Sequence, residues 1–263
     1  MSRTSLRNLL LGAAVLAAPL LSAGPPPEAL DADIVFLGEI HDNPQHHIVQ
    51  AAWVAAVQPE AVVFEMLTDA QAERVTPELV ADPGRMAEVL EWAASGWPDF
   101  ALYHPIFAAA PNALVIGAGL PRARLGDLQS VSIAEIFGAE AELFALDRPL
   151  ADEQQAAREA LQFAAHCDAL PAEMLPMMVD IQRLRDAYLA RATLRALEMT
   201  GGPVAVITGN GHARRDWGAP SMIDGPAVFV LGQSENGAGP EGGFDLVLDA
   251  TPAERPDPCA AFR

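Results

Sequence analysis

The chain has 263 residues and a formal net charge of −19, from 35 acidic and 16 basic residues. A surface this acidic repels phosphate backbones and anionic lipids, which argues against binding to nucleic acid or to a membrane surface. Every basic residue is arginine. The lack of lysine excludes a P-loop, a Schiff-base lysine and a Ser–Lys dyad.

The N-terminus has the composition of a secretory signal peptide. Arg3 and Arg7 precede an apolar run and then small residues up to Ala23, which is the usual order of such a signal. The run is shorter than the ~20 apolar residues that a membrane span needs. We therefore expect residues 1–23 to be removed and the protein to be periplasmic or secreted, without membrane insertion. No cysteine stands near the cleavage point, so we expect no lipid anchor.

Short apolar runs of strand length recur along the rest of the chain. Most are nearly continuous, as is typical of strands covered on both faces of a sheet, and helical patterns separate most of them. The sequence therefore predicts an α/β fold with a mainly parallel, doubly wound sheet. The expected strands are 33–39, 61–66, 113–119, 203–211, 227–232 and 244–250. The last two runs lie close together, and we expect them to form an edge hairpin.

Two helical regions frame this pattern. The first helix should begin at Pro44, with Asp42 or Asn43 as its cap, and run to about Val57. A long insertion, roughly 120–200, lies between the third and fourth expected strands and is interpreted as a helical cap over one end of the sheet. We find no internal repeat, and we expect residues 24–263 to form a single domain.

Polar side chains follow several of the expected strands where each strand ends. Glu39 and His41 follow the first strand, Glu65 ends the second, and His212 follows the fourth after Gly-Asn-Gly. The carboxyl ends of parallel strands open onto one edge, where ligands bind. Mixed carboxylate and imidazole sets hold divalent transition metals or act as acid–base pairs. These four residues are therefore candidate metal ligands or catalytic groups, although each alone could also cap a helix or satisfy backbone groups.

Further polar residues lie near this edge. His46 and His47 fall on the first turn of the first helix, where one could line the site and the other could be solvated. In the insertion, Arg185 and Asp186 belong either to a solvated face or to a group that points into the crevice. Arg185 and Arg214 are candidates for stabilising a developing oxyanion.

The chain contains two cysteines, Cys167 and Cys259. In an oxidising compartment an even pair favours a disulfide over two free thiols.

Several segments, taken together and in order, resemble the ChaN-like haem-binding uptake family of the Tiki superfamily. They are FLGEIHDNPQHHIVQ, VVFEML, GWPDFALYHPIF, HC at 166–167, QRLRDAYLA and VITGNGHARRDWGAP. The resemblance implies an exported, iron-related protein that binds haem, and a homodimer that holds haem between its subunits. It also implies kinship with metal-dependent hydrolases that use a Glu/His site.

The same resemblance suggests haem ligands, because the family is said to bind haem through tyrosine. The chain has two tyrosines, Tyr103 and Tyr188. Tyr103, beside His104 in GWPDFALYHPIF, is the stronger candidate, and the alternative is a tyrosine packed in the cap. Tyr103, His104 and His47 are therefore the candidate cofactor-binding residues. The chain departs from the pattern by lacking the lipid-bearing cysteine of many relatives and by carrying Leu189 where relatives often have methionine.

Three hypotheses about function follow. The first is an exported haem-binding protein for haem or iron uptake and handling. The second is a metal-dependent hydrolase that uses Glu39, His41, Glu65 and His212, with esters and peptides both open as substrates. The third is a vestigial site in a protein that only binds a partner. Whether the protein is an enzyme stays open at this point.

Overall fold

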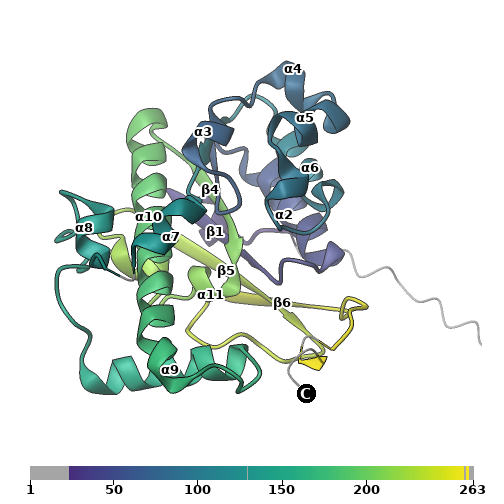
Figure 1. Ribbon diagram of the computed structural model, residues 1–263. Coiled ribbons are helices and arrows are strands. Elements are labelled where there is room, and N and C mark those ends of the chain that lie inside the picture. The colour runs from purple at the N-terminus through teal and green to yellow at the C-terminus, as the bar shows by residue number, and fades with distance from the viewer. Residues whose placement is uncertain (1–23, 129, 258, 261–263) are drawn as a thin grey trace, which may run out of the picture.

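The computed structural model describes residues 24–128, 130–257 and 259–260, so the predicted signal peptide at 1–23 lies outside the described residues. The described residues form one six-stranded sheet in the order β3-β2-β4-β1-β5-β6, and all neighbouring strands run parallel (Figure 1). The strands are β1 (Ile34–Glu39), β2 (Ala61–Phe64), β3 (Leu114–Gly117), β4 (Val204–Gly209), β5 (Val228–Glu235) and β6 (Leu246–Ala250). The predicted parallel α/β fold is confirmed.

Helices cover both faces of this sheet. Between β1 and β3 lie α2 (Pro44–Val57), α3 (Asp69–Ala72), α4 (Pro77–Val80), α5 (Pro83–Val89), η1 (Trp92–Ala94) and α6 (Phe100–Ala109). Between β3 and β4 lie α7 (Arg122–Asp127), α8 (Ile133–Phe137), α9 (Asp152–Ala165), η2 (Ala172–Met174) and α10 (Leu175–Thr200). The remaining helices are α1 (Pro27–Leu30), α11 (Asn210–Ala213) and η3 (Ala219–Met222). The predicted helical insertion between the third and fourth strands is thus confirmed.

Alternate residues of the central strand point into two separate cores. Ile34 and Phe36 pack with α8 and α10 on one face, whereas Val35 and Leu37 pack with α2 and α6 on the other. This alternation is why β1 reads as a continuous apolar run, since a strand buried on both faces has no polar side. Within the described residues, no helix has both the length and the apolar character needed to cross a membrane.

The expected edge hairpin is wrong, because β5 and β6 pair in parallel from Leu231↔Leu246 to Glu235↔Ala250. The connecting segment returns along the sheet before β6 begins. A side chain at Gly232 would meet the Phe244 ring at 2.8 Å, so this glycine gives the returning segment room. The backbone N–H of Asp245 then donates to the carbonyl of Val230, near the start of β5.

The C-terminal segment is fastened at two points. Arg255 forms ion pairs with Asp42, just before α2, and with Glu235 at the end of β5. The predicted disulfide between Cys167 and Cys259 is confirmed, with a Cα–Cα distance of 5.4 Å. It ties this segment to the turn after α9, which lies across one end of α10 (Figure 1). The segment therefore links the start of α2 to the helical insertion.

Candidate active site

The turn between β1 and α2 positions the first part of the site. Asn43 caps α2, since its side-chain oxygen accepts a hydrogen bond from the N–H of Gln45, and Pro44 occupies the first turn. The Asn43 amide also donates to Glu235 and to the carbonyl of Thr251. Helix α2 therefore begins a few residues after β1 ends, which keeps the intervening side chains at the carboxyl edge of the sheet.

Glu39 is the centre of a buried cluster at the end of β1. Its side chain is inaccessible to solvent. Its Oε1 accepts hydrogen bonds from the Tyr103 hydroxyl at 2.9 Å and from Nδ1 of His41 at 2.7 Å, and its Oε2 lies 3.4 Å from Nδ1 of His47. The Nε2 of His47 donates to the carbonyl of His41 at 2.8 Å. Oε1 of Glu39 thus holds the His41 imidazole and the Tyr103 phenol in place, whereas Oε2 of Glu39 and Nδ1 of His47 make no hydrogen bond among the described residues.

His41 is the accessible member of this cluster, with 34% of its side chain exposed. Its ring lies beside Trp97, with a centroid distance of 4.9 Å, and a side chain at Gly209 would stand only 2.9 Å from its Nε2. Burial lowers the pKa of His41, but the hydrogen bond to Glu39 and the charge of Glu65 outweigh this effect and raise it to about 9. Among the described residues, no hydrogen bond engages Nε2 of His41.

A second buried cluster forms around His212, in α11. Its Nδ1 donates to Asp186 at 2.6 Å, and its Nε2 lies 3.5 Å from Glu65. Glu65 Oε2 accepts from the hydroxyl of Thr208 at 2.7 Å and from the N–H of Gly209 at 2.9 Å. The imidazole therefore lies between two carboxylates, one from the end of β2 and one from α10.

The charges of Glu65 and His212 shift the pKa of each other in the direction that favours the ionised pair. Burial raises the pKa of Glu65, but His212, His41 and the donors from β4 overcome it and hold the pKa at about 2. Burial lowers the pKa of His212, and the charges of Glu65 and Asp186 raise it above its usual value. Burial also raises the pKa of Asp186. The cluster therefore favours an ionised Glu65 next to a protonated imidazole.

The structure brings Glu39, His41, Glu65 and His212 to one edge of the sheet, where Gly209 separates the two clusters. Its N–H donates to Glu65, and its α-carbon faces the ring of His41. Among the described residues, no group of three or more His, Cys, Asp or Glu side chains is arranged as a metal site. The four predicted residues are instead paired with carboxylates, imidazoles and backbone groups.

The other predicted residues occupy different positions. Tyr103 is fully buried, whereas His104, next in sequence, donates to the carbonyl of Val80. Arg214 is buried and forms a bidentate ion pair with Asp216. Arg185 is half-buried and lines a cavity near the site.

That cavity has a volume of about 320 Å³. It opens beside the turn that carries Trp97, and among the described residues that line it Arg185 is the only charged one. Its lining residues are Met66, Thr68, Gln71, Ala94, Ser95, Gly96, Trp97, Gly119, Leu120, Pro121 and Arg185. Ligand pockets commonly combine such apolar walls with a few polar groups. This cavity connects the second and third strand ends to the ring that borders His41.

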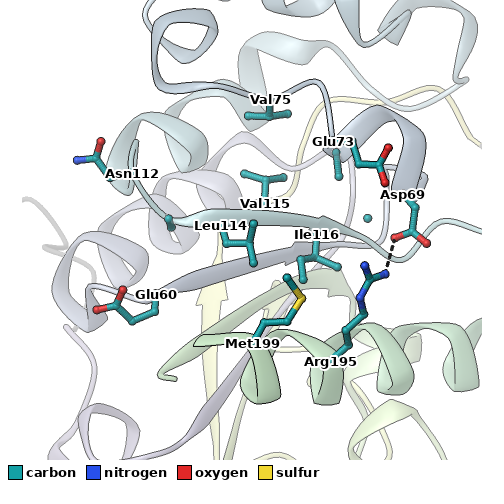
Figure 2. A pocket seen from close by; sticks show the side chains of 13 residues that line it. Glu60, Asp69, Glu73, Val75, Asn112, Leu114, Val115, Ile116, Arg195 and Met199 are labelled. Carbon is teal, nitrogen blue, oxygen red and sulfur yellow. Dashed lines mark ion pairs between the residues drawn. The ribbon is translucent and has the colours of Figure 1, made fainter. Parts of the chain in front are cut away.

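A separate cavity of about 460 Å³ lies along the open edge of β3 (Figure 2). Figure 2 shows Asp69 and Arg195 facing each other across it, with their charged atoms 4.0 Å apart. Its lining includes Leu114, Val115 and Ile116 of β3 and none of the predicted site residues. The carboxyl edge of the sheet is therefore the better candidate site.

Sequence reasoning did not assign several residues that the site uses. The sequence leaves Asp186 open between a solvated face and the crevice, and it assigns no role to Gln182, whose amide lies 3.1 Å from Nδ1 of His212. These two residues lie four apart on α10 and so share a helix face, which is the signal that could have found them. No signal in the sequence pointed to Trp97 as a neighbour of His41.

The fold and the site define an α/β protein with a doubly wound parallel sheet and a buried carboxylate–imidazole centre at its carboxyl edge. The chain belongs to the family described as haem-binding uptake, Tiki superfamily, ChaN, whose model matches residues 27–223. The resemblance found in the sequence is thus confirmed. No curated protein matches the chain.

A solved structure also shares this fold, and two further ones are similar to this chain with TM-scores below 0.5. The structure described as cofacial heme binding to ChaN of Campylobacter jejuni has 20% identity and a TM-score of 0.58, over 78% of this chain and 83% of that chain. The type III effector HopBA1 has 16% identity and a TM-score of 0.45, over 85% of this chain and 89% of that chain. A succinoglycan biosynthesis protein has 12% identity and a TM-score of 0.45, over 79% of this chain and 67% of that chain. At 20% identity, the first of these supports the fold alone.

Proposed function

We propose that this protein is an exported haem-binding protein that serves haem uptake or handling, with His41 as the residue that meets the iron. Membership of the haem-binding uptake family supports the class of ligand. The observation that carries the site is the environment of His41. Its Nδ1 is held by Glu39 at 2.7 Å, and its Nε2 has no hydrogen-bond partner among the described residues.

This arrangement suits a ligand to a metal centre. A ligating imidazole usually donates its other ring N–H to a carboxylate, which fixes the ring and makes the ligating nitrogen more basic. When bound, haem would supply a redox-active iron at this position. His41 would hold the iron, Glu39 would orient His41, and Tyr103 would fix the carboxylate from the buried side.

The other candidate ligands are less available in the described structure. Tyr103 has no exposed surface, and its hydroxyl already donates to Glu39. His47 is 2% exposed. His104 uses its Nε2 on a backbone carbonyl. We therefore propose supporting roles for Tyr103 and His47 and no iron contact for His104.

The cavity beside Trp97 supports the same ligand. An indole face and apolar side chains suit a porphyrin ring, and Arg185 at the same cavity suits a propionate carboxylate. A cavity of about 320 Å³ is at the lower end of the range for ligand sites, so haem would extend beyond it. Cofacial haem binding is described for the Campylobacter jejuni ChaN, and we infer that a second copy of this chain covers the remaining haem surface.

Titration with hemin tests this function. We expect a saturable shift of the Soret band at micromolar hemin, together with a change from monomer to dimer in analytical ultracentrifugation. His41→Ala should weaken binding at least tenfold and change the spectrum, whereas the matched variant His104→Ala should bind like the wild type. Circular dichroism controls for folding. A wild-type protein without a saturable shift would refute haem binding, and an unchanged His41→Ala spectrum would refute the site.

A compartment outside the cytoplasm is part of this proposal. The Cys167–Cys259 disulfide is consistent with an oxidising environment, and residues 1–23 have the composition of a signal peptide. N-terminal sequencing of the protein from periplasmic and culture fractions should give a mature chain that starts near Gly24. A full-length chain confined to the cytoplasm would refute export.

A second candidate function, hydrolysis of an ester or peptide, is favoured by the geometry at His212. The imidazole has a carboxylate 2.6 Å from Nδ1 and a second one 3.5 Å from Nε2, which suits proton transfer to or from a bound water. The positive charge of Arg185 lowers the pKa of His212. Arg185 is therefore the group that we assign to stabilising an oxyanion next to this imidazole.

Metal dependence of this hydrolysis is a separate proposal, because the same residues could hold a divalent transition metal if they rearranged. Elemental analysis of the purified protein and an ester and peptide screen test both points. Stoichiometric metal that is lost in His212→Ala would support a metal-dependent hydrolase. Activity that depends on His212 but persists after chelation would support acid–base hydrolysis without metal. A protein with neither metal nor activity would refute this second function.

A further inference from the structure

Helix α9 is amphipathic, yet the one buried residue of this helix is an arginine, Arg158. It is 8% exposed. A buried guanidinium normally requires a carboxylate or several carbonyls as partners, because an unpaired charge in the protein interior is costly. The burial of Arg158 therefore calls for a partner.

Arg158 has no such partner among the described residues. Its Nε and Nη1 are shielded from solvent and make no hydrogen bond. Two neighbouring buried arginines differ from it. Arg183 donates to the carbonyls of Ala145 and Arg148, and Arg214 forms a bidentate pair with Asp216. Among the three buried arginines of the described residues, Arg158 alone lacks a hydrogen-bond partner.

The surroundings of Arg158 hold the guanidinium next to the His212 cluster. Its Cζ lies 5.0 Å from the centre of the Trp217 ring, and that of Arg214 lies 3.8 Å from the same ring. Asp186 is the carboxylate with the largest electrostatic effect on Arg158, but no ion pair joins the two. Asp186 uses Oδ1 on His212, and its Oδ2 is also buried and unpartnered.

We propose that Arg158 is the receptor for a carboxylate group of a small ligand, bound next to the Asp186–His212 pair. A guanidinium presents parallel N–H groups that match the two oxygens of a carboxylate. The Trp217 ring lies beside the guanidinium and lines one side of this position. Asp186 and Asp216 lie nearby, so a single negative charge is accepted more readily than a phosphate dianion. This proposal rests on neither haem binding nor hydrolysis.

The test uses the ligand-free full chain and sodium acetate as the probe. Acetate should raise the melting temperature of the wild type saturably, by about 3 °C beyond sodium chloride at equal ionic strength. Arg158→Met should remove this response while keeping the stability of the free protein, because it replaces an unpaired charge by an apolar chain. The matched control is Arg85→Met, which removes an exposed arginine on α5 and should leave the response unchanged.

Further measurements keep the proposal falsifiable if Arg158→Met does not fold. In the wild type, acetate should then shift the side-chain Nε–Hε NMR signal of Arg158 in a saturable way. An equal response to phosphate would overturn the preference for a carboxylate. A wild type without an anion-specific response would overturn the site, whatever the stability of Arg158→Met.

Discussion

Raising the pH from about 6.5 to about 9 should weaken the fold of the ligand-free protein through His41. The pKa of His41 is 6.5 in an unfolded chain and about 9 in the folded protein. The folded state therefore holds this proton more tightly than the unfolded state. Its contribution to stability is fully present below pH 6.5 and is lost as the pH rises through 9.

The size of this contribution follows from the pKa difference and from the exposure of the side chain. Each unit by which folding moves a pKa corresponds to about 1.4 kcal/mol, so complete transfer of the effect would give ~3 kcal/mol. The His41 side chain is 34% exposed, and screening by solvent reduces such interactions. We therefore expect about 1.5 kcal/mol to be lost between pH 6.5 and pH 9.

Urea unfolding of the wild type and of His41→Gln at fixed ionic strength, from pH 6 to pH 9.5, measures this loss. Glutamine still donates a hydrogen bond to Glu39 but does not titrate, so the stability difference between the two proteins should shrink by about 1.5 kcal/mol. His212, whose pKa is also raised, is present in both proteins and cancels. His104→Gln is the matched control. Parallel pH profiles for the wild type and His41→Gln would contradict the proposed charge pairing at this site.

Three other outcomes are expected. Replacing Cys167 and Cys259 by serine opens a loop with a sequence separation of 92 and should lower the free energy of unfolding by at most ~4–5 kcal/mol in the chain-entropy model; equal melting temperatures would contradict this. Tyr103→Phe should cost about 1–3 kcal/mol, because the buried Glu39 carboxylate loses one of its two side-chain donors, and Tyr188→Phe is the control in the same unfolding assay. Glu65, whose pKa falls from 4.5 to about 2, stabilises the fold above pH 4.5, and this stability is lost as the pH falls towards 2. Glu65→Gln should therefore show a shallower acid slope in stability, and an unchanged slope would rule out the charge assignment.

The sequence predicts the fold well where the apolar pattern of each segment determines its secondary structure and burial. Continuous apolar runs separated by helical patterns require a sheet covered on both faces, and β1 shows why, since both sides of this strand are buried. The order of β5 and β6 was not predictable in this way. It depends on a connection that returns along the sheet against Gly232, and the short spacing suggested a hairpin instead.

Some residues of the site were likewise predictable from the sequence, and others were not. Glu39 and Glu65 stand at strand ends, so topology alone places them at the carboxyl edge. Asp186 and Arg158 come from helices, and their side chains reach His212 and Trp217 only because of how α9 and α10 are rotated on the sheet. That rotation depends on packing among many side chains, which local periodicity does not specify.

The spectrum and metal content of the protein isolated from its native host test the central claim most directly. The account predicts a Soret band and iron in proportion to haem, and it predicts that both are lost when the chromosomal copy carries His41→Ala. A colourless protein, or one that carries a stoichiometric transition metal without haem, would contradict it.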